Sequence, residues 1–127
     1  MKKILVLDGC ESLEFLYKKE LIWNDRIVIT ITYKNKYLQI INRKEPDLIV
    51  MDNMIPIEKQ KCILKKIREN HQELPIILHS FISGHTAEIK DLFLTKSYNL
   101  NELKHKANVI LETRKISHEN RTSACVC

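Results

Sequence analysis

Residues 48–51 form a run that is apolar at every position, Leu-Ile-Val-Met, between Asp47 and Asp52. A strand with one face in water alternates apolar and polar side chains, whereas a strand covered on both faces is apolar almost throughout. The run is therefore typical of a central strand in a parallel sheet, where helices cover both faces.

Apolar runs alternate with stretches of helical periodicity along most of the chain. The predicted strands are residues 4–7, 27–33, 47–51, 76–79 and 92–95. The predicted helices are residues 11–23, residues 35–44, a lysine-rich segment after Pro56, and residues 99–114. The strand–helix unit recurs about five times, which predicts an α/β fold with a parallel sheet between helices.

A length of 127 residues suits one domain, and no linker or repeat divides the chain. Apolar periodicity stops after Lys115, so residues 1–115 are predicted as the domain and 116–127 as a polar tail. Cys125 and Cys127 could be metal ligands, but zinc sites usually need paired ligand sets. Incidental reduced thiols in an unordered tail are the favoured interpretation.

The net charge of +5 suggests a negatively charged partner. The lysines are scattered over the predicted helices and the aromatic residues are not interleaved with them, so nucleic-acid binding is not favoured. Solvated helix faces, or a docking surface for an acidic protein, fit better. No apolar run approaches the ~20 residues of a membrane span, and the start does not resemble a signal peptide, so a cytoplasmic location without membrane contact is expected.

Four polar residues follow or end the predicted strands: Asp8, Asp52, Ser80 and Lys96. Function in such sheets gathers at the carboxyl ends of the strands. Carboxylates can hold Mg²⁺, while a hydroxyl and an ammonium group can contact phosphoryl oxygens. The set predicts phosphoryl chemistry. With only two glycines, the chain has no Gly-rich phosphate loop or dinucleotide fingerprint.

Three segments carry a family resemblance: residues 46–56 (Pro-Asp-Leu-Ile-Val-Met-Asp-Asn-Met-Ile-Pro), 74–80 (Leu-Pro-Ile-Ile-Leu-His-Ser) and 93–98 (Phe-Leu-Thr-Lys-Ser-Tyr). From about residue 2 to 114 the chain resembles a response-regulator receiver domain of two-component signalling. The resemblance implies a flavodoxin-like, doubly wound five-stranded parallel sheet of order 2-1-3-4-5 with about five helices.

The resemblance also implies a switch. Asp52 would accept a phosphoryl group from a histidine kinase or a phosphotransfer protein. Ser80 and Lys96 would contact that group, and Phe93 would turn inward as Ser80 moves. The rearranged surface would then bind a downstream protein target, and the chain could also pair with a second copy of itself.

For Mg²⁺, the resemblance implies ligands from Asp8, Asp52 and the backbone carbonyl of Met54. The family usually has two consecutive acids after the first strand, but Gly9 stands in place of the second. Losing a carboxylate from so small a ligand set predicts weaker Mg²⁺ binding, unless Glu11 reaches back to the site.

The chain departs from the family pattern at three further places. Only 15 residues lie between Ser80 and Lys96, so the fourth helix, within residues 84–90, is predicted to be short. Ser97 stands where a proline usually follows the lysine, which disfavours a cis peptide bond there. The segment Ile57-Glu-Lys-Gln60 contains two charged residues where the family often has a glycine-containing turn.

Structural explanations remain for each site residue. Asp8 and Asp52 could be turn acids, Ser80 a helix cap and Lys96 a solvated side chain. His79 is interpreted as a strand residue packed under a helix and is left out of the site. Cys10 is interpreted in the same way, as a small packed side chain.

Three functions follow in order of preference. The first is a stand-alone, phosphorylation-switched receiver that signals through protein contact, because no DNA-binding module follows residue 114. The second is a phosphorylation-independent pseudo-receiver adaptor, favoured by Gly9 and the short fourth helix. A small enzyme is the third, but no cofactor or nucleophile signature supports it. No enzymatic activity is expected beyond Mg²⁺-dependent self-phosphorylation and dephosphorylation of Asp52.

Overall fold

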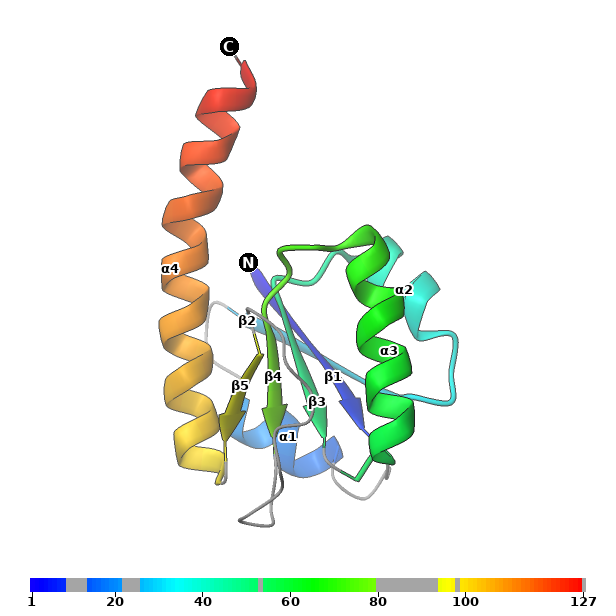
Figure 1. Ribbon diagram of the computed structural model, residues 1–127. Helices are drawn as coiled ribbons and strands as arrows, with labels where there is room; N and C mark the ends of the chain where they lie inside the picture. Colours follow the sequence, from blue (N-terminus) through cyan, green and yellow to red (C-terminus); the bar gives the residue numbers. More distant parts are fainter. Residues whose placement is uncertain (9–13, 22–25, 53, 80–93, 98, 127) are drawn as a thin grey trace.

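The computed structural model describes residues 1–8, 14–21, 26–52, 54–79, 94–97 and 99–126 (Figure 1). Five parallel strands form one sheet in the order β2-β1-β3-β4-β5. The strands are β1 (Lys2–Asp8), β2 (Arg26–Thr32), β3 (Leu48–Asp52), β4 (Ile76–His79) and β5 (Leu94–Ser97). The predicted doubly wound, flavodoxin-like sheet is confirmed.

β5 differs in its bounds from the strand predicted at residues 92–95. Its residues pair with those of β4 one by one, from Ile76 beside Leu94 to His79 beside Ser97. Backbone pairing with the neighbouring strand, rather than apolar content, decides where a strand ends. The strand therefore includes the polar residues Lys96 and Ser97.

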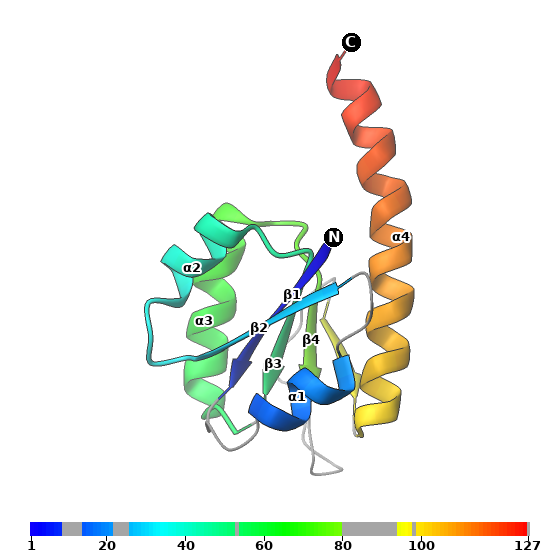
Figure 2. The same cartoon turned by 180° about the vertical axis from the view of Figure 1, so that it is seen from behind.

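Helices cover both faces of the sheet (Figures 1 and 2). α1 (Glu14–Leu21) and α4 (Leu100–Val126) lie on one face, and α2 (Tyr37–Lys44) and α3 (Ile57–Asn70) lie on the other. The short helix predicted within residues 84–90 lies outside the described residues.

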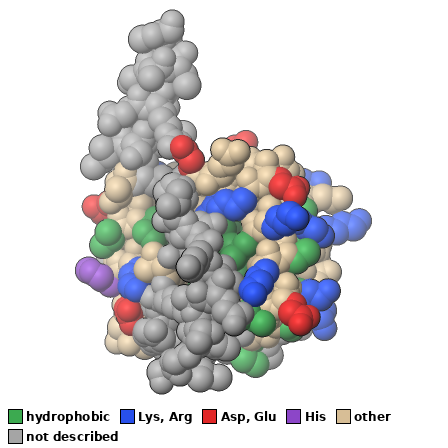
Figure 3. All heavy atoms as spheres, viewed as in Figure 1, with side chains coloured by type: hydrophobic (Ala, Val, Ile, Leu, Met, Phe, Trp, Pro, Cys, Tyr) green, Lys and Arg blue, Asp and Glu red, His purple; other side chains and the backbone are tan. Residues whose placement is uncertain are grey.

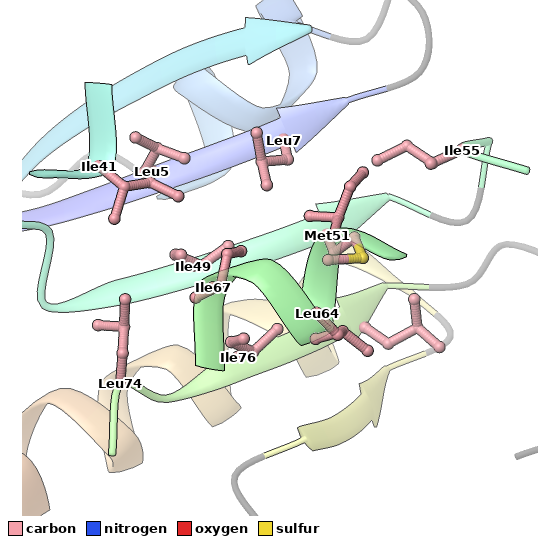
Figure 4. Close-up of a cluster of buried hydrophobic side chains, with 12 residues drawn as sticks. Leu5, Leu7, Ile41, Ile49, Met51, Ile55, Leu64, Ile67, Leu74 and Ile76 are labelled. Atoms are coloured by element: carbon pink, nitrogen blue, oxygen red, sulfur yellow. The ribbon is translucent and has the colours of Figure 1, made fainter. Parts of the chain in front are cut away.

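A cluster of apolar side chains fills the layer between the sheet and α2 and α3 (Figure 4). In this cluster Ile67 of α3 lies beside Ile49 of β3. Its buried members are Leu5, Leu7, Ile41, Ile49, Met51, Ile55, Ile63, Leu64, Ile67, Leu74, Ile76 and Leu78. Each fully buried side chain of this size contributes about 1.5–3 kcal/mol, so this layer supplies much of the stability.

The opposite layer lies between the sheet and helices α1 and α4. It contains the strand residues that alternate with those of the first layer. Its buried residues are Ile4, Val6, Tyr17, Leu21, Leu48, Val50, Ile77, Leu103, Ala107 and Leu111. Successive side chains of a strand point to opposite faces. Asp8 and Asp52 therefore continue the rows of Val6 and Val50 and lie on the α1/α4 face.

The start of β3 is fixed against β1 by a reciprocal pair of hydrogen bonds. The backbone N–H of Asp47 donates to the carbonyl oxygen of Lys3 at 2.8 Å. The backbone N–H of Lys3 donates to Asp47 Oδ2 at 2.9 Å. This pair sets the register that brings the carboxyl ends of β1 and β3 to the same edge.

α4 is longer than the helix predicted at residues 99–114. It runs from Leu100 to Val126, so residues 116–126, predicted as an unordered tail, continue the helix. Neither glycine nor proline occurs in this segment, and so nothing in the backbone chemistry ends the helix there. Figure 1 shows this end of α4 extending past the sheet.

Candidate phosphoacceptor site

Two carboxylates meet at the carboxyl-end edge of the sheet. Asp8 is the last residue of β1 and Asp52 the last residue of β3. The strands are neighbours, and Leu7 pairs with Met51 immediately before the two acids. Both aspartates are completely buried. The structure thus brings together the two acids that the sequence predicted for the site.

The turn after Asp52 is held by hydrogen bonds from both sides. The backbone N–H of Met54 donates to Asp52 Oδ1 at 3.2 Å, and that of Ile55 donates to the Asp52 carbonyl oxygen at 3.2 Å. From α3, the buried Gln60 side chain donates to the Ile55 carbonyl oxygen at 2.8 Å. The orientation of Asp52 is therefore tied to the turn and to α3.

Tyr17 lies on the same side of the sheet and was missed as a site residue. Its ring is fully buried, and its hydroxyl oxygen is 2.8 Å from His79 Nδ1. The two rings meet edge to face, with centroids 5.5 Å apart. In the sequence Tyr17 falls within the helix predicted at residues 11–23 and was not considered for the site, although a buried tyrosine hydroxyl usually requires a partner.

The carboxylates act on this hydroxyl. Burial raises the pKa of Tyr17 above its ordinary value, and the negative charges of Asp52 and Asp8 and a hydrogen bond with Asp52 raise it further. The hydroxyl is therefore a neutral donor at physiological pH, located close to both acids.

His79 lies beside Asp52 in the sheet, since the two residues pair in the register of β3 and β4. It was left out of the predicted site. Its side chain is buried, and burial lowers the pKa of His79 to about 4, an effect that the charge of Glu102 partly opposes. The imidazole is therefore neutral at pH 7, with one ring nitrogen protonated.

Comparison with known proteins gives one weak sequence match. No protein-family model matches the chain. The alkaline phosphatase synthesis transcriptional regulatory protein PhoP of Bacillus subtilis (strain 168) is 27% identical over 122 residues, covering 91% of this chain and 51% of PhoP. The chain thus spans about half the length of the curated relative it matches.

Solved structures of response-regulator receiver domains resemble the fold of this chain. The signal receiver domain of a LuxO repressor protein from Vibrio parahaemolyticus aligns with a TM-score of 0.73 and 21% identity, over 92% of this chain and 95% of that one. The response regulator TrrA from Thermotoga maritima, solved in complex with Mg²⁺-BeF, aligns with a TM-score of 0.66 and 27% sequence identity, over 87% of this chain and 99% of TrrA. The structure of TrrA in complex with the histidine kinase ThkA aligns with a TM-score of 0.67 and 24% sequence identity, over 87% of this chain and 99% of the matched chain.

The chain is a single receiver-like domain, and the solved structures that it resembles are receiver domains of response regulators. The resemblance seen in the sequence is confirmed at this level. Among its described helices, none is long and apolar enough to cross a membrane.

Several of the receiver residues predicted from the sequence remain untested. Glu11, Ser80 and Phe93 lie outside the described residues, as does Gly9. The backbone of Lys96 lies in β5 beside Leu78 of β4.

The oxygen donors of Asp8, Asp52 and Met54 are of the kind that Mg²⁺ prefers. Mg²⁺ is usually held by one or two carboxylates and keeps several water ligands. Asp8 and Asp52 are such a pair, and the Met54 backbone carbonyl is the third candidate ligand. Within the described part of the chain no group of three or more His, Cys, Asp or Glu side chains could hold a metal. When bound, Mg²⁺ would supply positive charge against phosphoryl oxygens.

The surface of the domain on the α3 side carries many basic side chains (Figure 3). Four lysines on the outer surface of α3 are exposed: Lys59, Lys61, Lys65 and Lys66. The layer beneath them is apolar, so these lysines form a solvated face that can meet acidic groups of a partner.

Proposed function

We propose that the protein is a response-regulator receiver in which Asp52 is the phosphoacceptor. The observation that carries the proposal is the buried pair of Asp8 and Asp52 at the ends of adjacent parallel strands. A carboxylate pair with a backbone N–H on Asp52 suits phosphoryl transfer better than a structural turn, since burying two charges without a function is costly. The similarity to TrrA, solved with Mg²⁺-BeF, supports it.

In the proposed reaction a carboxylate oxygen of Asp52 attacks the phosphorus of the donor. The new bond joins that oxygen to phosphorus, and the bond from phosphorus to the donor's leaving atom breaks. The leaving atom takes the bonding electron pair, and the product is an acyl phosphate on Asp52. Asp8, Met54 and Asp52 would hold the Mg²⁺.

The proposed donor is a histidine kinase or a phosphotransfer protein, because TrrA has been solved in complex with the histidine kinase ThkA. The proposed output is contact with a downstream protein in the cytoplasm. The exposed lysines of α3 favour a partner surface with acidic side chains.

A pseudo-receiver adaptor is the second candidate. The observation that favours it is Gly9, which replaces the second acid of the family pattern. In this alternative the same fold binds its partner without phosphorylation and Mg²⁺ binds weakly.

The test is an intact-mass spectrum after incubation with Mg²⁺ and acetyl phosphate. The expected result is one phosphoryl adduct on the native chain and none on Asp52→Asn, a variant of nearly equal size. Asp8→Asn should slow the reaction, and raising the Mg²⁺ concentration should partly restore it. Absence of an adduct on the native chain at high Mg²⁺ would favour the adaptor.

A further inference from the structure

The edge strand β2 directs backbone hydrogen-bonding groups away from the sheet. It lies at one end of the strand order, and within the described residues it pairs only with β1 (Figure 2). The backbone N–H of Tyr33, just after β2, donates to the carbonyl oxygen of Asp8 in β1 at 3.0 Å. Backbone groups of successive residues alternate between the two sides of a strand. The odd-numbered residues of β2 therefore face β1, whereas Val28 and Thr30 direct their N–H and C=O groups outward.

β2 lacks the features by which proteins usually protect such an edge, which are lysine, proline or a β-bulge. Residues 27–32 read Ile-Val-Ile-Thr-Ile-Thr, without charge or proline, and they pair one to one with β1. The side chain of Ile27 is 42% exposed and residues 28–32 are only partly buried, whereas every residue of β3 and β4 is buried. We propose that this edge binds β2 of a second copy of the chain in antiparallel pairing.

A second copy fits this edge because the strand matches itself when it is reversed. In an antiparallel register centred on Ile29, that residue faces its own copy, and Ile27 faces Ile31 of the second copy. Val28 then faces Thr30, and the two residues exchange both backbone hydrogen bonds, as their outward direction requires. The three isoleucines share one face of the strand, where Ile29 and Ile31 pack against the α2/α3 cluster. Cross-strand aliphatic pairs thus continue one isoleucine row over both chains.

The distribution of charge also favours a second copy over an acidic partner. The chain carries a net charge of +5, but residues 27–32 contribute nothing to it. Arg26, at the start of β2, is buried and donates to Asn108 Oδ1 of α4 in its own chain. The first charge after the strand is Lys34, whose Nζ lies 5.9 Å from the centroid of the Tyr33 ring. An uncharged strand is the complement of this edge, and β2 itself is such a strand.

The proposed dimer does not depend on Asp52, so the unmodified protein tests it. Sedimentation velocity at micromolar to submillimolar concentrations should show a monomer–dimer equilibrium. Thr30→Pro removes an outward N–H from each copy, hence two hydrogen bonds from the dimer, and should weaken association about thirtyfold. An edge strand tolerates proline where the N–H faces solvent, and the melting temperature of the variant checks its folding. A native chain that stays monomeric at every concentration would overturn the proposal.

Two exposed apolar side chains distinguish this edge from the surface of α4. Ile27→Lys places a charge opposite Ile31 of the second copy and should weaken association at least about tenfold. Val109 of α4 is 52% exposed, so Val109→Lys adds the same charge at another apolar position and should leave the dimer unchanged. A dimer that survives Ile27→Lys but is lost in Val109→Lys would assign the contact to α4 and overturn the proposal.

Cross-linking tests the register without weakening the edge. In a chain whose four cysteines are replaced by serine, Ile29→Cys places two thiols opposite each other across the twofold axis. Residues of a non-hydrogen-bonded antiparallel pair have Cα atoms about 4.5 Å apart, within the range of a disulfide. Ile27→Cys is displaced from its own copy by four residues, roughly 14 Å, and should not cross-link. Diamide should therefore convert only Ile29→Cys into a covalent dimer on a non-reducing gel. Absence of that product from a chain that still dimerises would overturn the proposal.

Discussion

The side-chain amide of Gln60 donates to the carbonyl oxygen of Ile55 at 2.8 Å and lies 3.5 Å from that of Asp52. Gln60 is buried in the first turn of α3. The amide therefore donates to backbone carbonyls in the turn that follows β3. Receiver domains often have a glycine-containing turn in this part of the chain. The segment Ile57-Glu-Lys-Gln60 thus contains the side chain that stabilises the turn after Asp52.

Replacing Gln60 by Met is therefore expected to destabilise the fold by about 1–2 kcal/mol, because the Ile55 carbonyl loses its buried donor while the volume stays similar. Urea unfolding followed by circular dichroism measures this change. Lys65→Met, on the exposed side of the same helix, should change the free energy of unfolding by no more than about 0.5 kcal/mol. Equal effects of the two substitutions would contradict the role of Gln60.

The depressed pKa of His79 predicts that stability falls in mild acid. Its pKa is about 4 in the folded protein and about 6.5 in the unfolded chain. Between these values the unfolded chain binds the additional proton, so the free energy of unfolding decreases as the pH falls from about 6.5 to 4 and does not decrease further below that from this group. The full shift corresponds to about 3 kcal/mol.

Unfolding by urea at several pH values measures this dependence. His79→Asn should show a flatter profile over the same interval, since the titrating group is gone. Parallel profiles of the native protein and the variant would mean that other groups cause the loss.

Glu45 offers a stabilising substitution. It caps the end of α2 with φ at 49°, a left-handed conformation that is costly for any residue with a Cβ atom. Glu45→Gly is expected to raise the free energy of unfolding by up to about 1 kcal/mol, as glycine is the usual residue at this cap. Thermal unfolding tests it, with Glu45→Ala as the control that should bring no gain. A lower melting temperature for the glycine variant would contradict the expectation.

Gly9 can be used to test the ligand count of the metal site. Gly9→Asp restores the second acid of the family pattern and is expected to tighten Mg²⁺ binding on the order of tenfold. Isothermal titration calorimetry measures the change. Asn70→Asp, at the exposed end of α3, adds the same charge away from the site and should leave the affinity nearly unchanged. Equal gains in both variants would point to net charge alone.

The sheet could be predicted from the sequence because its strands are apolar runs. β4 has the predicted bounds, and the two aspartates at the ends of β1 and β3 meet as expected. Residues at the carboxyl ends of neighbouring parallel strands lie at the same edge of the sheet, and this does not depend on how the side chains pack. The carboxylate pair was therefore accessible to sequence reasoning.

The Tyr17–His79 pair was not accessible in this way. Tyr17 has the helical spacing of an apolar residue and His79 the position of a strand residue, and both do pack in the core. Their hydrogen bond depends on how α1 lies across β4, which neither local pattern contains. The length of α4 escaped prediction for a different reason. Apolar periodicity marks only the part of a helix that covers the sheet, whereas the helix continues until its backbone is interrupted.

The alternation of side chains along the strands gives the two faces of the sheet unequal freedom to change in evolution. On the α2/α3 face the buried residues of β1, β3 and β4 are aliphatic side chains and methionine, which can be exchanged for one another as long as volume is kept. On the α1/α4 face the same strands end in Asp8, Asp52 and His79. Mutations there alter fold and chemistry together. Homologues of this protein should therefore drift in sequence on one side of the sheet while the other side changes only in concert with the site.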